Sequence, residues 1–169
     1  RLSNRDIANM VTAAIEQVLP LLGSSGDVLV FLPSQGAIHA ALQQSEVLLK
    51  SHTHITCHAL YGAMSLSAQE QIIRPDVTSL SASHQQRIIF ATNIAETSVT
   101  IPNVTLVIDT GLEKTALFDV KSGLTKLVTQ RIAKSSAEQR AGRAGRVQEG
   151  RCMRLWSKAQ HHQLDDFSP

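Results

Sequence analysis

Apolar residues recur at helical spacing in the first twenty positions. They lie three and four residues apart, behind Ser3 and Asn4, whose side chains can cap a helix. These apolar positions are Ile7, Met10, Val11, Ala14, Ile15, Val18 and Leu19. The pattern predicts an amphipathic helix that ends at about Pro20.

Short, continuous β-prone runs then alternate with helical stretches. Strands are predicted at 28–32, 55–60, 87–91 and 104–108, and helices at 35–50 and 68–73. The run VLVFL has apolar residues on both faces, as strands of a covered parallel sheet have. The alternation predicts an α/β domain with right-handed crossovers, in which ligands bind beyond the carboxyl ends of the strands.

The pattern changes after residue 111. Two β-prone arms at 115–119 and 124–128 flank the sequence VKSG, which predicts a β-hairpin. Residues 74–86 are rich in serine and show no periodicity, so we predict a surface loop there.

The last part of the chain predicts one more helix and one more strand. Ser135 stands three residues before a glutamate, a spacing typical of a capping box that opens a helix. Residues 152–156 resemble a closing strand, and we place its tryptophan, Trp156, in the core. We interpret His161 and His162 as a solvated tail.

Length and composition favour one domain. The chain has 169 residues, and its longest uninterrupted aliphatic or aromatic run has five, far short of the roughly 18 that a membrane span needs. The two cysteines form no C-x-x-C pair, which argues against a disulfide framework and a zinc ribbon. We therefore expect a cytoplasmic protein with no membrane partner.

Potential metal ligands gather near the second predicted strand, at His52, His54, Cys57 and His58. No second ligand pair stands at a spacing typical of structural zinc. We interpret the histidines as strand or loop residues and Cys57 as a packing residue, and we predict no metal site.

Charge is concentrated in one part of the sequence. The net charge is only +2, but residues 114–158 hold eleven Lys and Arg residues against three acidic ones, a net charge of +8. Such a segment either binds an anionic partner or forms a solvated basic face, and charge alone does not distinguish the two.

The octet QRAGRAGR, residues 139–146, is the strongest candidate for phosphate chemistry. Its three arginines, at 140, 143 and 146, are predicted along one side of a helix with only Ala and Gly between them. Guanidinium groups match phosphoryl oxygens and stay charged. Because each glycine inside a helix costs about 1 kcal/mol relative to alanine, a merely solvated helix explains this sequence less well.

Two further segments lie where parallel strands end. The sequence ATNIAETS, residues 91–98, follows the third strand, and its hydroxyl and amide groups can bond phosphate oxygens or cap the backbone. Asp109 ends the fourth strand before Thr-Gly, where we favour ordering of the adjoining turns over a catalytic role.

Four of these segments together resemble a known family. The sequences LVFLP, ATNIAETS, VIDTG and QRAGRAGR, in this order, are similar to motifs IV, V and VI of the second RecA-like domain of DEAH-box helicases. The resemblance covers nearly the whole chain, and LFD…GL at 117–124 is most similar to the bacterial Hrp-type branch. It implies a RecA-like parallel sheet flanked by helices, with a β-hairpin insertion, and a helicase C-terminal domain over 1–169. The implied function is that of the second lobe of an ATP-dependent RNA helicase.

The resemblance also implies roles at the nucleotide. Gln139, Arg143 and Arg146 match positions that face the triphosphate, with both arginines as arginine fingers and Gly142 beside the nucleotide. Ser98 matches the position that senses the γ-phosphate.

Ile73 stands where eukaryotic relatives place an aromatic ring against adenine. Aliphatic contact is weaker than aromatic stacking, so we expect loose selectivity among nucleotides.

On the nucleic acid, the resemblance implies that Thr92 and Asn93 contact the backbone or the nearby hairpin. The hairpin at 114–128, with Lys121 and Lys126, matches a hook that engages RNA. Ser34 stands where the family has a glycine, and Pro102 where it has an aspartate. These departures leave a second interpretation open, a catalytically inactive module that binds or remodels nucleic acid. The choice between RNA and DNA also stays open.

The sequence lacks two motifs that nucleotide hydrolysis needs. It has no G-x-x-x-x-G-K-[ST] and no Asp-Glu pair to hold Mg²⁺. The resemblance implies that a first RecA-like domain, on the amino-terminal side in cis, binds most of the ATP, or another NTP, together with Mg²⁺. We expect single-stranded RNA as the partner, a monomer, and no hydrolysis by this chain alone.

Overall fold

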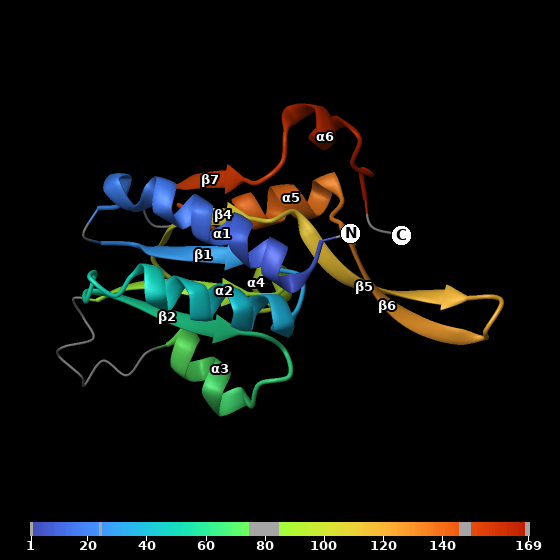
Figure 1. Cartoon of the computed structure of the whole chain (residues 1–169), viewed down its shortest axis with the longest axis horizontal. Helices are drawn as coiled ribbons and strands as arrows, with labels where there is room; N and C mark the ends of the chain where they lie inside the picture. Colours follow the sequence, from blue (N-terminus) through green and yellow to red (C-terminus); the bar gives the residue numbers. More distant parts are fainter. Residues whose placement is uncertain (1, 24, 75–84, 146–149, 168–169) are drawn as a thin grey trace.

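The computed structural model describes residues 2–23, 25–74, 85–145 and 150–167. Five parallel strands form the central sheet in the order β2-β3-β1-β4-β7, and a separate two-stranded hairpin extends from it (Figure 1). The sheet strands are β1 (Asp27–Phe31), β2 (Ile55–Leu60), β3 (Gln86–Ala91), β4 (Val104–Asp109) and β7 (Arg151–Arg154). The predicted parallel α/β fold with a hairpin insertion is confirmed.

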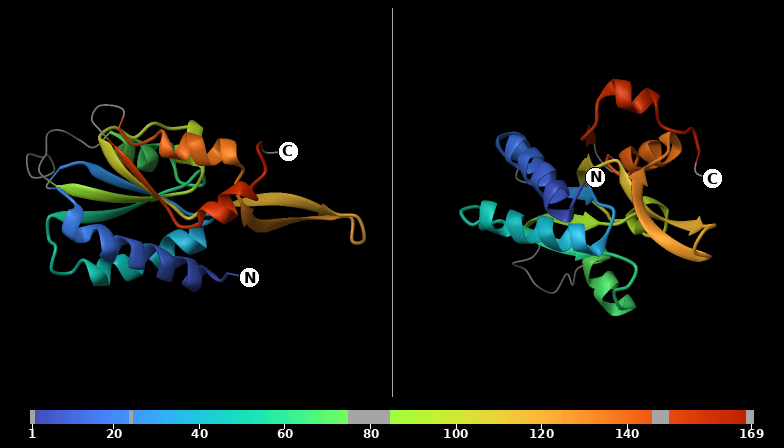
Figure 2. Two further views of the ribbon diagram at one scale, coloured as in Figure 1. Left: turned by 90° about the horizontal axis from the view of Figure 1, so that it is seen from above. Right: turned by 45° about the vertical axis from the view of Figure 1, so that its right-hand side comes forward.

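Helices cover both faces of the sheet (Figure 2). One face carries α1 (Asn4–Val18) and α2 (Gln35–Leu48), which pack against each other. The other face carries α3 (Leu66–Ile73), α4 (Ile94–Thr97) and α5 (Lys134–Ala141). A 3₁₀ turn (Leu19–Leu21) follows α1, and α6 (Lys158–His162) lies near the carboxyl end of the chain. No helix in the described part of the chain is both long and apolar enough to cross a membrane.

The central strand β1 explains why both faces are covered. All five of its residues are buried, and successive side chains enter opposite layers of the core. Val28 and Val30 pack on the α1/α2 side, whereas Leu29 and Phe31 pack on the α3–α5 side. Burial of each such side chain stabilises the fold by about 1.5–3 kcal/mol, and any shift of register would exchange the two sides.

The start of α5 differs from the prediction. Ser3, Ser34, Ser65 and Ser157 each cap a helix with their side chains, but α5 begins at Lys134 with no side-chain cap. Its first amides instead donate to backbone carbonyls of the C-terminal segment, from Lys134 N to Asp165 O (2.7 Å) and from Ser135 N to Asp166 O (3.1 Å). The predicted capping box at Ser135 is therefore wrong, because a segment distant in sequence supplies the cap.

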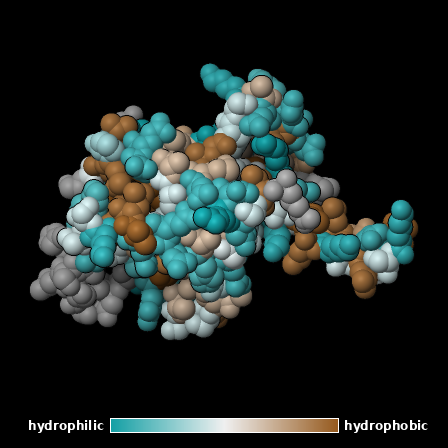
Figure 3. All heavy atoms as spheres, viewed as in Figure 1, coloured by the Kyte–Doolittle hydropathy of each residue, from teal (hydrophilic) through white to brown (hydrophobic). Residues whose placement is uncertain are grey.

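The hairpin consists of β5 (Leu112–Asp119) and β6 (Leu124–Arg131) and projects from the carboxyl edge of the sheet (Figures 1 and 2). Both arms are longer than predicted. Gly123 adopts a φ of +68°, and the Asp119 carboxylate accepts hydrogen bonds from Lys121 N and Ser122 Oγ, which closes the turn. Apolar side chains stay exposed along the arms, as Figure 3 shows.

The carboxyl-terminal residues also differ from the prediction. β7 ends at Arg154, so Trp156 lies beyond the strand, and it is half-buried rather than in the core. His161 and His162 belong to α6, and His161 is half-buried against Trp156. The predicted solvated tail is therefore wrong for His161. Most of the predicted surface loop at 74–86 lies outside the described residues.

Gly111 is required by the packing of Trp156. Its φ is +73°, and a Cβ atom there would lie 2.6 Å from the indole ring. We expect Gly111→Ala to lower the free energy of unfolding by about 1–3 kcal/mol, measured by urea denaturation. Gly23→Ala is the matched control, because no atom lies within 4 Å of its Cβ position. Equal effects of the two substitutions would contradict this explanation.

Candidate functional site

A cleft of about 450 Å³ lies at the carboxyl edge of the sheet. The segments that follow β1, β2 and β3 form one wall, and the hairpin forms the other. Thr92 and Asn93 come from the segment after β3, and Lys114 and Leu127 come from the two arms of the hairpin. The structure therefore brings the predicted pair Thr92 and Asn93 next to the hairpin.

The amino end of α2 opens into the same cleft. Ser34 caps this helix, with its Oγ accepting from Ala37 N (3.2 Å), and Gln35 and Gly36 line the cleft. The amino end of a helix carries partial positive charge and favours phosphate. Ser34, which departs from the family pattern, thus has a structural use here.

Tyr61 and Gly62 also line the cleft but were not identified from the sequence. They follow directly on β2. Their position after the carboxyl end of a parallel strand is the sequence signal that could have identified them as site residues. Lys121 and Lys126 do not line the cleft: Lys121 lies in the turn of the hairpin and Lys126 on its outer part, both exposed.

A second group of predicted residues lies on the α3–α5 side of the sheet. Arg143 Nε donates to the backbone carbonyl of Glu96 (2.6 Å), and its Nη1 donates to Thr100 Oγ1 (3.3 Å). Ser98 lies between these two acceptors in sequence, exposed at the end of α4. Arg143 and Ser98 are therefore neighbours in the structure.

The remaining nucleotide candidates are spread over this side. Gln139 and Gly142 are exposed at the end of α5. Ile73 ends α3, which packs against β2, whereas α5 packs against β4, so the structure does not bring Ile73 to Arg143. Arg146 lies outside the described residues.

Arg140 and Arg143 do not share one side of a helix, so the prediction of a common arginine face is wrong for these two residues. Helix α5 ends at Ala141, and the chain then turns so that Gly145 N donates to Val104 O (3.0 Å). Gly145 has a φ of +79°, which favours glycine. The glycines of the octet thus end the helix, and Arg140 and Arg143 point to different surroundings.

Arg140 is fully buried and forms an ion network. Its Nε contacts Glu96 Oε1 (2.9 Å), and its Nη1 contacts Asp109 Oδ1 (2.9 Å) and the carbonyl of Leu112 (3.3 Å). Its guanidinium carbon lies 4.8 Å from the ring centre of Phe31. One side chain therefore joins α4, the end of β4 and the start of the hairpin.

Asp109 orders the adjoining turn. Its Oδ1 accepts from Gly111 N (2.8 Å), and the carboxylate is completely buried. Burial raises the pKa of Asp109, while the Arg140 guanidinium and the Gly111 amide act in the opposite direction. These contacts fit the expected turn-ordering role and leave the carboxylate out of contact with solvent.

No group of three His, Cys, Asp or Glu side chains in the described ranges is placed to hold a metal ion. Burial raises the pKa of the Cys57 thiol to about 11, so the thiolate form that binds metals is disfavoured. Glu96 and Asp109 both bind Arg140.

Comparison with known proteins finds similar sequences among helicases. Residues 11–148 match the family described as the helicase conserved C-terminal domain. The chain is 40% identical over 136 residues to the ATP-dependent RNA helicase HrpB of Escherichia coli, and 41% identical over 140 residues to the ATP-dependent RNA helicase HrpA of Borreliella burgdorferi. These alignments cover 80% and 83% of this chain and 16% of each relative.

A solved structure shows the same fold. The crystal structure of the Escherichia coli DEAH/RHA helicase HrpB superposes with a TM-score of 0.82 at 34% identity, over 100% of this chain and 20% of that chain. The chain thus spans a fifth or less of these relatives.

Proposed function

The chain belongs to the family of helicase conserved C-terminal domains, and on that premise we propose that it is the second lobe of an ATP-dependent RNA helicase. One observation supports this function above others. The segment after β3 reaches both candidate regions, because Thr92 and Asn93 line the cleft and the Glu96 carbonyl holds Arg143. A single short segment can therefore respond to nucleic acid and to nucleotide.

At the nucleotide, Arg143 and Arg146 act as arginine fingers that neutralise the charge of the transferring phosphoryl group. The Ser98 hydroxyl, on the segment between the two residues that Arg143 contacts, bonds a γ-phosphate oxygen. Gln139 and Gly142 contact the nucleotide from the exposed end of α5. These groups suit phosphate oxygens and not Mg²⁺, since Glu96 and Asp109 already pair with Arg140.

A first RecA-like domain in cis supplies the P-loop, the carboxylates for Mg²⁺ and most of the ATP site. Arg143 and its neighbours complete that site from across the interface between the two domains. Closure of the two lobes then couples hydrolysis to movement along the strand.

At the nucleic acid, the cleft holds the backbone of a single strand. Hydrogen-bond donors come from Thr92, Asn93, Lys114 and the amino end of α2. Contacts of these donors with the phosphate backbone do not depend on the base sequence. Lys121 and Lys126 lie further along the hairpin, where they contact RNA outside the cleft.

A catalytically inactive module of the same fold is the second candidate. Pro102, in the exposed turn before β4, replaces a family carboxylate and favours this alternative. Ser34 no longer does so, because its hydroxyl caps α2.

Hydrolysis of ATP by the full-length gene product, with and without single-stranded RNA or DNA, tests this function. We expect RNA to stimulate hydrolysis. Lys114→Gln should raise the RNA concentration for half-maximal stimulation about three- to fivefold, as loss of one phosphate contact does near physiological salt. Lys50→Gln, exposed after α2 and away from the cleft, is the matched control. Absence of hydrolysis with every nucleic acid would leave the inactive module.

A further inference from the structure

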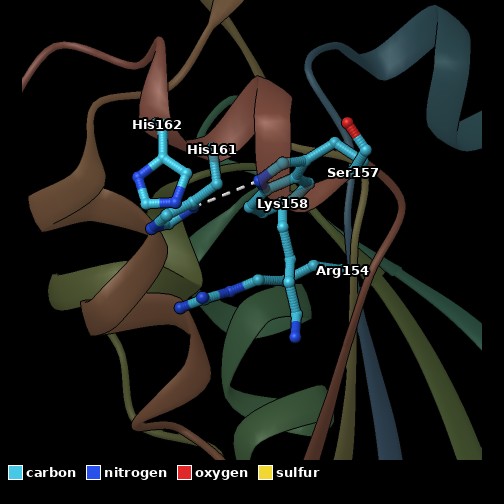
Figure 4. A pocket seen from close by; sticks show the side chains of 6 residues that line it. Arg154, Ser157, Lys158, His161 and His162 are labelled. Carbon is cyan, nitrogen blue, oxygen red and sulfur yellow. Dashed lines mark hydrogen bonds between the residues drawn. The ribbon is translucent and has the colours of Figure 1, made fainter.

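A second pocket, of about 310 Å³, lies between the end of β7 and α6 (Figure 4). We call it the α6 pocket. It is lined by Arg154, Trp156, Ser157, Lys158, His161 and His162. Four of these side chains are basic and none is acidic, and the proposed function uses none of them.

The pocket has an ordered aromatic wall. The Arg154 guanidinium carbon lies 5.7 Å from the centre of the Trp156 ring, and the His161 ring lies nearly parallel to the indole, 6.2 Å away with an interplanar angle of 12°. Trp156 Nε1 contacts His161 Nδ1 at 3.2 Å (Figure 4). Because an indole nitrogen only donates, Nδ1 accepts, and neutral His161 carries its proton on Nε2, from which it can donate to a ligand.

No carboxylate lines this pocket in the part of the chain that the structure describes. Elsewhere, Arg87 pairs with Asp27, Lys134 with Asp166, and Arg140 with two carboxylates. Arg154 forms no direct ion pair within the described residues, although Asp109 and Cys152 are close enough to interact with its charge. Its Nη2 makes a long bond to Ala137 O (3.4 Å), and its buried Nε has no hydrogen-bond partner there.

The surroundings of His161 are consistent with a positive field. Its pKa is lowered by burial and by Arg154, Lys134 and His162, with Glu138 acting in the opposite direction. More basic than acidic groups thus act on His161, and a bound anion reduces the repulsion among the basic groups.

The α6 pocket and the cleft border the same part of the hairpin. Trp156 packs on Gly111, directly before β5, and Leu155 N donates to Asp109 O (2.9 Å). Glu113 and Lys114, two and three residues further along, line the cleft. Both sites thus adjoin the base of the hairpin, where the proposed function places nucleic acid.

We propose that the α6 pocket binds a backbone phosphate of the nucleic acid. Arg154 contributes a guanidinium fork, Lys158 a mobile charge and His161 an Nε2–H donor, which together match the several oxygens of a phosphate better than the two of a carboxylate. Phosphate contacts carry no sequence information, so this site holds the strand in position without selecting bases. The inference rests on the proposed function, because it takes nucleic acid as the ligand.

Binding of a single-stranded RNA oligonucleotide to the full-length gene product, measured over a series of salt concentrations, tests the pocket. Lys158→Gln, at an exposed position, should weaken binding about three- to fivefold and reduce the log–log salt slope by roughly 0.7, the value for one phosphate on a single strand. Arg154→Gln should weaken it at least as much. Lys50→Gln removes the same charge far from the pocket and should leave the slope unchanged.

The other possible results of these measurements distinguish failure of the pocket proposal from failure of the proposed function. If the wild type binds RNA and Lys158→Gln binds with the same slope, the pocket proposal fails while the proposed function stands. If inorganic phosphate shifts the imidazole NMR signals of His161 and the RNA slope is unchanged, the pocket holds a free anion and the nucleic-acid assignment fails. An unchanged slope with a lower melting temperature in Lys158→Gln would show that Lys158 supports the fold and does not bind a phosphate of the nucleic acid. If the wild type binds no nucleic acid, the proposed function itself fails.

Discussion

Arg143→Ala is expected to reduce ATP hydrolysis by the full-length gene product by roughly 10³-fold or more. An arginine finger acts on charge that develops only in the transition state, so its loss lowers kcat far more than it weakens nucleotide binding. Arg143 is held by the Glu96 carbonyl and Thr100, on the segment that also carries Ser98. Steady-state hydrolysis with saturating RNA measures the effect.

Two further variants separate this catalytic role from a structural one. Arg143→Lys keeps the charge but loses the planar fork, so most of the loss should persist. Lys50→Ala removes an exposed cation that follows the carboxyl end of α2, away from both candidate regions, and should leave kcat unchanged. A loss of less than tenfold in Arg143→Ala would mean that this residue is not an arginine finger.

The strands of the sheet were predictable because each is a short apolar run whose partners are other apolar runs. The predicted bounds of β2 coincide with the observed ones, β3 begins one residue earlier than predicted, and β1 is shifted by one residue at both ends. The carboxyl-end rule correctly predicted that Thr92 and Asn93 lie at the edge of the sheet, where the cleft is found.

Two of the errors involve residues whose partners are distant in sequence. Spacing alone suggested that Arg140 shares a surface with Arg143, but two carboxylates from α4 and β4 draw Arg140 into the core. Likewise, carbonyls at 165 and 166 replace the cap expected at Ser135. A local pattern contains no information about such tertiary partners.

The buried network places Arg140 between the two candidate regions. Its guanidinium binds Glu96, whose carbonyl holds Arg143, and the Leu112 carbonyl, where the hairpin begins. The hairpin and the segment that binds Arg143 therefore share one buried side chain. Disruption of the network should affect stability first, because every member is wholly or largely buried.

Arg140→Met is expected to lower the free energy of unfolding by about 3–5 kcal/mol. Methionine keeps much of the apolar stem but leaves two carboxylates without a partner, and an unpaired buried charge is strongly destabilising. Urea denaturation of the 169-residue chain measures the change. Arg74→Met is the matched control: Arg74 pairs with Glu70 at the surface, and its loss should cost less than about 1 kcal/mol.

The pH dependence of that loss identifies the carboxylate responsible. Burial already raises the pKa of Asp109 from its ordinary value of 3.8, and removal of the opposing guanidinium raises it further. The folded variant then keeps a proton on Asp109 to a higher pH than the folded wild type does. Its deficit relative to wild type should therefore grow as the pH rises from the raised pKa of Asp109 in the wild type to the still higher pKa in the variant. Asp109→Asn in the Arg140→Met background removes this titration and should recover part of the stability. A deficit that is independent of pH, or that grows on acidification, would show that Asp109 is not the carboxylate that Arg140 stabilises.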